Sequence, residues 1–306
     1  MIEIIAAVLG GAIRSGTAVL FACLGELIAE RAGVVNLGTE GCMLAGALGA
    51  FAGTAATGNP FLGALAGGLC GAALASVHAY VAVIRRANQL ASGLAITILG
   101  LGITSFWGRS FVSVQIQPMN SVSIPVLSDL PLIGPVLFQH DPLTYLAMLL
   151  APAIWFFLYR TRWGLVLRAT GERQDVVYSV GATPTLIRCL AVIAGGFLAG
   201  LGGAQLAVAY TLNWVENMTQ GRGFVAVALV IFASWSPFMA VAGSYLFGGA
   251  LSLQLALQAQ GVGVSPYLMS AVPYVVTLLV LVLVGRRRRQ AMPEELRAVF
   301  EGGAGV

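Results

Sequence analysis

The stretch that decides the fold is Tyr267-Leu-Met-Ser-Ala-Val-Pro-Tyr-Val-Val-Thr-Leu-Leu-Val-Leu-Val-Leu-Val-Gly285, which is followed at once by Arg286-Arg-Arg-Arg289. As a helix, a run of this kind can cross the hydrocarbon core of a bilayer, which takes about 20 apolar residues. A block of arginines directly after such a run is typical of a cytoplasmic flank. The segment therefore predicts a transmembrane helix whose carboxyl end faces the cytoplasm.

Similar apolar runs recur along the whole chain. Of its 306 residues, 58% are hydrophobic and only 9% are charged, whereas a soluble domain carries about 25% charged residues. We therefore predict an all-α fold, a polytopic transmembrane helical bundle of about 8–10 spans with discontinuous helices and an internal repeat. The apolar runs lie at 4–29, 37–57, 61–84, 90–108, 142–159, 187–211, 223–234, 238–258 and 267–285.

The basic residues indicate the topology. All 16 are arginines, and they concentrate at Arg85 and Arg86, in the segment 160–188 and in the tail. We expect these three regions to face the cytoplasm. The loop 109–141 has a single arginine with four prolines and two aspartates, which predicts an external loop. Nine crossings place the amino terminus outside, and a tenth would place it inside.

A single transmembrane domain over residues 1–306 follows from this pattern. Its parts are a first half at 1–108, the external loop at 109–141, a second half at 142–285 and a cytoplasmic tail at 286–306. Arginines at the ends of apolar runs report topology, so we expect no nucleic-acid partner.

Two interruptions break the picture of straight spans. The first is Gly33-Val-Val-Asn-Leu-Gly-Thr-Glu-Gly41, and the second surrounds the apolar run 223–234. That run has only 12 residues, too few to cross a bilayer. One such interruption in each half indicates discontinuous helices at a transport site, and two ordinary loops are the alternative.

Small residues recur at a spacing of four in two spans. These residues are Gly63, Gly67 and Gly71 in one span and Gly196, Gly200 and Ala204 in another. The pattern favours close helix packing over a role in a pathway. The four cysteines, Cys23, Cys42, Cys70 and Cys189, lack CxxC spacing, so we interpret them as buried packing residues and not as metal ligands or disulfide partners.

The motifs of an enzyme are missing. Without a lysine, the chain contains no GxxxxGK[ST] phosphate loop, so we expect no ATP site and no cofactor in this chain. We expect neither His78 nor His140 to bind a metal, and His78 is better explained as a hydrogen-bonded packing residue. We predict no catalytic and no metal-binding residues, and the chain is not expected to be an enzyme.

Acidic side chains within apolar sequence are costly and point to function. Glu26, Glu30 and Glu40 are of this kind. Glu40 would either contact a solute or sit in the first turn of a helix capped by Asn36. In the second half, a polar group either contacts solute or belongs to the interfacial belt. Its members are Gln205, Asn213, Trp214 and Glu216.

The sequence resembles a known family at several places in a fixed order. The run Glu30-Arg-Ala-Gly-Val-Val-Asn-Leu-Gly-Thr-Glu-Gly-Cys-Met-Leu-Ala-Gly-Ala47 resembles the signature of ABC importer permeases of the ribose, nucleoside and branched-chain amino acid superfamily. Trp163-Gly-Leu-Val-Leu-Arg-Ala-Thr-Gly-Glu172 resembles its cytoplasmic coupling segment. Three later motifs are similar to the nucleoside (BmpA-linked) branch, and they are Gly221-Arg-Gly-Phe-Val-Ala-Val-Ala228, Phe247-Gly248 and Val272-Pro-Tyr-Val275.

The resemblance implies a permease subunit for a nucleoside or related sugar-containing solute. It also implies partners: cytoplasmic ABC ATPase subunits that use the ATP, a second permease subunit that is identical or different, an external solute-binding protein, and membrane lipid. The expected location is the bacterial inner membrane, with a cytoplasmic carboxyl terminus. Ribose-like sugars or branched-chain amino acids are the alternative solutes, and an ion-coupled secondary transporter is the alternative class.

The resemblance and the polar residues within apolar sequence together give candidate site residues. The segment 160–188 would couple to the ATPase through Trp163, Gly164, Arg168, Gly171, Glu172, Arg173 and Gly181. The translocation pathway would be lined by Asn36, Gly38, Glu40, Gln89, Ser92, Thr97, Gln205, Asn213 and Trp214.

Overall fold

A computed structural model describes residues 2–130, 133–259, 266–285 and 292–301. Eight helices in these ranges have 19 or more residues, and they are α1 (Ile2–Arg31), α2 (Thr39–Thr57), α3 (Pro60–Ala79), α4 (Gln89–Gly108), α6 (Pro142–Arg160), α9 (Pro184–Gln205), α11 (Pro237–Ala259) and α12 (Pro266–Gly285). The helix α10 (Arg222–Phe232) is shorter, with 11 residues. Two π-helical turns, η1 (Tyr80–Ile84) and η3 (Leu206–Thr211), extend α3 and α9.

The remaining elements lie near the two ends of the long helices. They are the 3-10 turn η2 (Arg109–Phe111), the strands β1 (Val122–Ser123) and β2 (Gln139–His140), α5 (Ile133–Leu137), α7 (Arg162–Glu172), α8 (Gln174–Ser179) and α13 (Glu294–Glu301). The two strands pair in antiparallel fashion, with Val122 opposite His140.

Several helices have the composition of membrane spans. Within the described residues, six are long and apolar enough to cross a bilayer, and they cover Ala6–Arg31, Pro60–Ile84, Gln89–Phe111, Pro142–Arg160, Pro184–Thr211 and Pro237–Ala259. The helices therefore follow the predicted apolar runs closely, and the prediction of an all-α, polytopic membrane bundle is confirmed. Nothing in the arrangement tests the internal repeat, which stays a prediction.

Polar side chains set where two of the spans begin. Asn59 precedes α3, and its Oδ1 accepts a hydrogen bond from the amide of Phe61 (2.9 Å). Asp141 precedes α6, and its Oδ1 accepts from the amide of Thr144 (3.0 Å). In both helices the first residue is proline, which has no amide hydrogen to leave unpaired. Local sequence therefore determines these boundaries.

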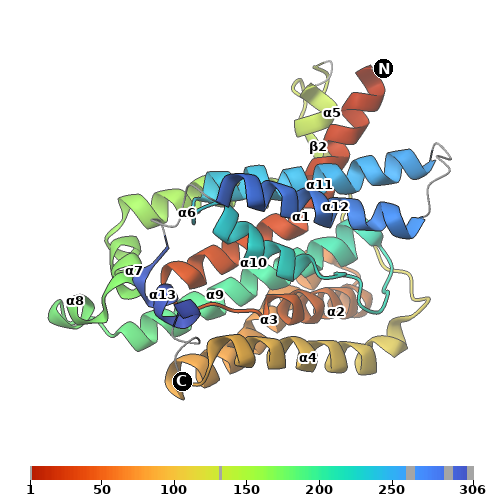
Figure 1. The fold of residues 1–306 in the computed structure, drawn as a ribbon. Coiled ribbons are helices and arrows are strands. Elements are labelled where there is room, and N and C mark those ends of the chain that lie inside the picture. The colour runs from red at the N-terminus through yellow and green to blue at the C-terminus, as the bar shows by residue number, and fades with distance from the viewer. Residues whose placement is uncertain (1, 131–132, 260–265, 286–291, 302–306) are drawn as a thin grey trace.

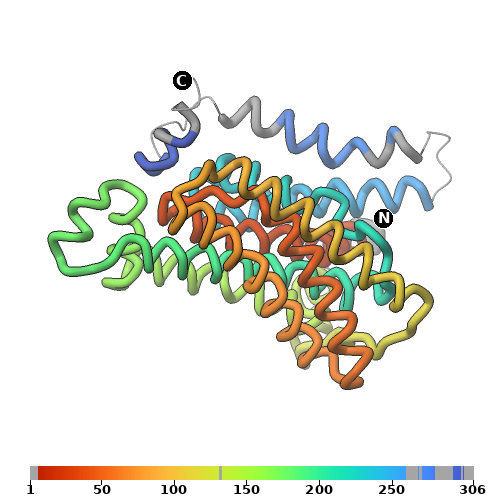
Figure 2. The backbone as a smooth tube through the Cα atoms, turned by 90° about the horizontal axis from the view of Figure 1, so that it is seen from below, coloured from red at the N-terminus to blue at the C-terminus, as the bar shows by residue number. Residues whose placement is uncertain are grey.

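The two ends of the molecule differ in what they carry. Figure 1 shows α7, α8 and α13 at one end, whereas the start of α1 lies with α5 and β2 at the opposite end. Figure 2 shows the same separation between α8 and the amino terminus. Arg86 lines a cavity with Gln174 and Arg188, so two of the predicted cytoplasmic regions meet at one end. The arginines at 286–289 lie outside the described residues.

Glycines allow the central helices to touch. Helices α2, α3 and α9 pack against one another, and a Cβ added to Gly200 would lie 2.5 Å from the carbonyl oxygen of Gly67. A Cβ at Gly67 would lie 2.6 Å from the carbonyl oxygen of Gly46. Such backbone contact is how small residues hold helices together in lipid. The packing interpretation of the small-residue pattern is therefore confirmed.

The cysteine interpretation is only partly right. Cys23 and Cys42 are buried and Cys189 is half-buried, but Cys70 is exposed on α3. The prediction of a buried Cys70 is wrong, because α3 turns this side toward a shallow apolar groove between α2 and α4. An apolar environment in a membrane protein does not require burial within the protein.

We expect Gly200→Val to destabilise the bundle strongly, because its side chain would collide with the backbone of α3. Overpacking of this kind costs about 1–3 kcal/mol or more. Thermal unfolding in detergent should show a clearly lower Tm and less monodisperse protein. Gly102→Val on α4 is the matched control, because nothing lies within 4 Å of a Cβ at that position. Equal unfolding temperatures for the two variants would contradict the close α3–α9 contact.

Candidate functional site

The break between α1 and α2 is a built structure inside the protein. Glu26 accepts hydrogen bonds from the amide of Asn36 (2.7 Å) and from the hydroxyl of Thr39 (2.8 Å). The side-chain oxygen of Asn36 accepts from the amide of Gly38 (2.9 Å). All four residues are buried or half-buried. Irregular backbone at such depth needs partners within the protein, so these residues do not form an ordinary surface loop.

Side chains of α3 and α4 satisfy more of the same backbone. Gln89 Oε1 accepts from the amide of Val35 (2.9 Å), and Thr97 donates to the carbonyl of Leu37 (2.9 Å). The ring of His78 lies within 3.1 Å of both Ser92 Oγ and the Val35 carbonyl oxygen. The histidine is therefore a hydrogen-bonded packing residue, as expected. Together these contacts hold the break against two neighbouring helices.

Glu40 joins the break to α10, which lies far along the chain. Its Oε1 accepts from the hydroxyl of Thr219 (2.5 Å) and from the amide of Gly221 (2.8 Å), while Oε2 accepts from the amide of Gly223 (2.6 Å). The first amides of a helix carry partial positive charge and favour an anion. The carboxylate therefore acts as a cap for α10, in addition to its own place in the first turn of α2. This geometry favours the structural alternative for Glu40 over direct contact with solute.

The other end of α10 is tied to α1 by a second carboxylate. The indole N–H of Trp235 donates to Glu30 Oε2 (2.6 Å), and Arg31 donates to the Trp235 carbonyl oxygen (3.2 Å). Glu30 and Trp235 are both buried, and each residue is only 1% exposed. Helix α10 is therefore held at its first turn by Glu40 and just beyond its last turn by Glu30.

The structure divides the predicted pathway residues into two groups. Six of them gather at the break, and they are Asn36, Gly38, Glu40, Gln89, Ser92 and Thr97. Gln205 lies elsewhere, buried in α9, and donates to the carbonyl of Arg14 (3.1 Å). Trp214 covers Gly108 at the end of α4, and Asn213 is exposed. Their role in a pathway stays a prediction.

One detail of the predicted break is wrong. We expected Asn36 to cap the helix that contains Glu40, but the residue before α2 is Gly38, and no side chain caps that helix. The Asn36 side chain instead turns back on the amide of Gly38. The backbone amide of Asn36 donates to Glu26, and its side-chain oxygen is used by Gly38. Asn36 therefore shapes the turn before the helix and does not cap it.

The predicted coupling residues lie on α7 and in the segment after it, and some are exposed whereas others are buried. Trp163 is 75% exposed, and Leu165, Val176, Tyr178 and Val180 are each more than half exposed; we call these five side chains the apolar surface. Arg173 and Gly181 are also exposed, and Gly181 has a φ of 75°. Gly164 is buried against the carbonyl of Phe157. The segment thus has an outward apolar surface at the end of the molecule.

The inward side of this segment contacts the rest of the protein. Arg168 Nε donates to the carbonyl of Leu158 (3.0 Å). Gly171 packs so closely on the Arg31 carbonyl that a side chain there would overlap it. The end of α7 is therefore fastened to the end of α1, immediately before the break.

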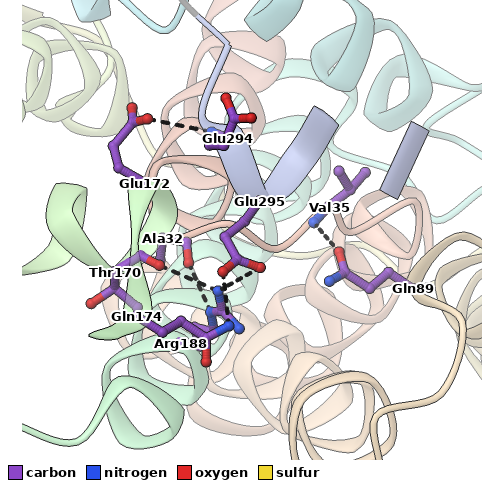
Figure 3. A network of polar contacts seen from close by, with 9 residues as sticks. All are labelled: Ala32, Val35, Gln89, Thr170, Glu172, Gln174, Arg188, Glu294 and Glu295. Atoms are coloured by element: carbon purple, nitrogen blue, oxygen red, sulfur yellow. Dashed lines mark hydrogen bonds and ion pairs between the residues drawn. The ribbon is translucent and has the colours of Figure 1, made fainter. Parts of the chain in front are cut away.

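Arg188 links three separate parts of this end (Figure 3). Its Nε donates to the carbonyl of Ala32 at the start of the break (3.1 Å), and its Nη2 donates to the carbonyl of Thr170 in α7 (3.2 Å). It also forms an ion pair with Glu295 of α13 (3.2 Å). Gln174 donates to the same carboxylate (2.9 Å). A single guanidinium thus connects the break, the coupling segment and the last described helix.

Sequence reasoning did not single out Arg188, Glu295 or Trp235 as site residues. In the sequence, Arg188 is only one of the arginines of the segment 160–188, and Trp235 only follows the apolar run 223–234. The partners of Arg188 are up to 156 positions away, and Trp235 and Glu30 are separated by 205 positions. No local pattern marks such pairs.

We expect Glu40→Gln to destabilise the junction between α2 and α10, because an amide offers one acceptor oxygen where two are used. An unpaired buried donor costs about 1–3 kcal/mol. The measurement is Tm in detergent together with protease sensitivity near residue 220. Glu216→Gln, an exposed acid in the preceding segment, is the matched control and should leave both unchanged. A wild-type Tm for Glu40→Gln would show that the cap is dispensable.

Comparisons with known proteins agree with one another. A family model described as "Branched-chain amino acid transport system / permease component" matches residues 7–283. The chain is 42% identical to the "Putative glucose ABC transporter permease protein TsgC13" of Haloferax volcanii, over 90% of this chain and 91% of that protein. It is 32% identical to the "Guanosine ABC transporter permease protein NupQ" of Bacillus subtilis, over 92% of each. It is 33% identical to the "Nucleoside ABC transporter permease protein NupC" of Lactococcus lactis, over 87% of this chain and 88% of that protein.

No solved structure matches the chain. The matches nevertheless extend over the break, α7 and α10, which carry the motifs that the resemblance rested on. The resemblance to ABC transporter permeases is thereby confirmed. The chain belongs to the branched-chain amino acid transport system / permease component family and is a multi-pass ABC transporter permease subunit.

Proposed function

We propose that the chain forms half of the translocation pathway of an ABC importer for a nucleoside or a related sugar-containing solute. The printed names of its relatives, which include glucose, guanosine and nucleoside permeases, support this class of solute. Ribose-like sugars and branched-chain amino acids are the alternatives, and the description of the family supports the latter.

In this proposal the chain is not an enzyme and holds no cofactor, and ATP is hydrolysed by two separate ATPase subunits. The apolar surface that begins at Trp163 is the observation that carries the assignment. An exposed short helix with apolar side chains suits a groove on a soluble partner. A second permease, identical or different, would complete the pathway, and lipid would surround the pair.

The proposed orientation places α7, α8 and α13 in the cytoplasm. Arginines at the ends of spans concentrate at this end, as is typical of a cytoplasmic face. The segment 109–141, with its strand pair and α5, would then face the outside of the cell membrane. It would receive solute from an external binding protein, and nine passes would place the amino terminus on the same side.

The network at Arg188 suggests how an ATPase could act on the pathway. A displacement of α7 would move the Thr170 carbonyl, and Arg188 also holds the Ala32 carbonyl at the start of the break. Glu26 connects α1 to the break, Glu40 connects the start of α2 to the start of α10, and Glu30 connects α1 to Trp235 just beyond α10. A shift of the break would therefore be transmitted to α10. ATP-driven closure of the ATPases would in this way exchange inward and outward access. Nucleotide can shift such an equilibrium only by binding the two states differently.

An ion-coupled secondary transporter would also use broken helices. It would have no use for an apolar surface at the tip of α7 and α8, where Trp163 and Val180 are 75% and 67% exposed. The ABC importer explains that surface, and the competing class leaves it unexplained.

We expect Trp163→Ser to abolish docking of the ATPase, because it removes the most exposed aromatic side chain of the apolar surface. The amount of ATPase subunit that co-purifies with the permease should fall at least about tenfold, as for loss of an interface hot spot of about 2 kcal/mol. Trp107→Ser on α4, 61% exposed, is the matched control. Full retention of the ATPase by Trp163→Ser, or solute uptake by the chain without any ATPase, would refute the assignment.

We expect Arg188→Gln to keep the ATPase bound while reducing solute uptake per ATP hydrolysed. The amide cannot reproduce the two carbonyl contacts and the ion pair that the guanidinium makes. The measurement is the ratio of solute transported to phosphate released in proteoliposomes. Arg85→Gln, an exposed arginine at the same end, should keep the wild-type ratio. An unchanged ratio for Arg188→Gln would mean that coupling takes another route.

A further inference from the structure

A charged side chain is exposed on the first membrane-spanning helix. Arg14 lies within the span Ala6–Arg31, and its side chain is exposed. Its Nη2 donates to the carbonyl of Ala209 (2.7 Å), and its guanidinium lies 5.9 Å from the ring centre of Tyr210. An arginine facing lipid at this depth is costly, by about 2.5 kcal/mol or more. This face of α1 is therefore expected to border water or protein and not lipid.

A second arginine approaches the same aromatic ring from α10. Arg222 is the first residue of that helix, is only 9% exposed, and lies 5.9 Å from the ring centre of Tyr210. Its Nη1 is buried and has no hydrogen-bond partner among the described residues. Buried donors are rarely left unpaired, because each costs about 1–3 kcal/mol. This atom is therefore poised to bind something that is not part of the chain.

The nearby acid, Glu40, forms no ion pair with Arg222. Both oxygens of Glu40 already accept hydrogen bonds from the start of α10, and within the described ranges neither Arg14 nor Arg222 forms an ion pair. Tyr274 of α12 lies beside the start of α10, with its hydroxyl donating to the Gln220 carbonyl (2.6 Å). The two guanidiniums carry more positive charge than Glu40 offsets, so these groups disfavour a cation, and their donors and aromatic rings suit a compound that carries oxygen atoms.

We propose that Arg14, Tyr210 and Arg222 line the solute path, and that Nη1 of Arg222 donates a hydrogen bond to an oxygen atom of the solute. The inference rests on the proposed function, because nucleosides and sugars carry the hydroxyl and carbonyl oxygens that such a donor needs. A cationic solute would be rejected by the same pair of arginines. Arg222 would thus select solutes where η3 meets the start of α10.

The test uses the complete transporter, with its ATPase and its solute-binding protein, in proteoliposomes. Uptake of a nucleoside, of its single-deoxy analogues, of a neutral sugar and of a branched-chain amino acid is measured at saturating binding protein for wild type and Arg222→Gln. Arg109→Gln, an exposed arginine at the end of α4, is the matched control. Basal ATP hydrolysis and co-purification of the ATPase show that each variant is assembled.

The expected result is that Arg222→Gln slows uptake of the parent solute about tenfold or more, in keeping with one lost hydrogen bond to a charged group. Wild-type transporter should take up slowly the one deoxy analogue that lacks the contacted oxygen. Arg222→Gln should take up that analogue at the same slow rate. Equal slowing of all solutes, or none, would overturn the inference. Transport of only the amino acid by wild type would instead overturn the proposed solute class, so the two failures are distinct.

A second measurement does not depend on that variant. Tyr210→Cys, in a chain that also carries Cys70→Ser and Cys189→Ser, should react with a hydrophilic thiol reagent, and transported solute should slow the reaction. Leu99→Cys, on the exposed apolar face of α4, is the control that should stay unreactive. An unreactive Tyr210→Cys, or a reaction rate that solute does not change, would place this face outside the path.

Discussion

Three buried acidic side chains provide hydrogen-bond partners that lipid tails cannot offer to irregular backbone and to a buried indole. Glu26 binds the turn between α1 and α2, Glu40 binds the first amides of α10, and Glu30 binds the indole just beyond its last turn. Burial of each acidic side chain costs desolvation, and hydrogen bonds within the protein offset that cost. The arrangement of the short elements depends on these contacts, because neither the break nor α10 has enough regular helix to be stable in a membrane by itself.

The same contacts connect the elements at the α7–α8 end of the protein. Arg188 reaches the break from α9, and Gly171 brings the end of α7 against the end of α1. The apolar surface on α7 and α8 is therefore only a few residues from the buried polar network. Under the proposed function, this short distance would give a physical route from the ATPase to the break and α10. Helices α3 and α9, by contrast, are held together by glycine contacts.

Two of the family's sequence motifs meet at one place in the structure. The motif 30–47, which first suggested a permease, contains the break and Glu40, whose carboxylate holds the start of α10. The later motif 221–228 is that start. Two motifs about 180 positions apart in the chain are thus one structural junction, as the Glu40 contacts with Gly221 and Gly223 show. The solute-facing groups cannot be inferred in this way, because a motif records which residues recur and not which side chains remain unpaired.

The sequence by itself determined the spans, their approximate ends and the positions of the two interruptions. Each follows from local properties: the length of apolar runs, the caps at Asn59 and Asp141, and the glycines of the break. The resemblance also indicated the coupling segment. Only the tertiary structure decided that Glu40 caps α10, that Asn36 does not cap α2, that Cys70 is exposed, and that Arg188 and Trp235 belong to the site. The physical reason is that hydrogen bonding and burial in a bundle depend on which helix faces become neighbours, and residues more than 150 positions apart carry no mark of that pairing.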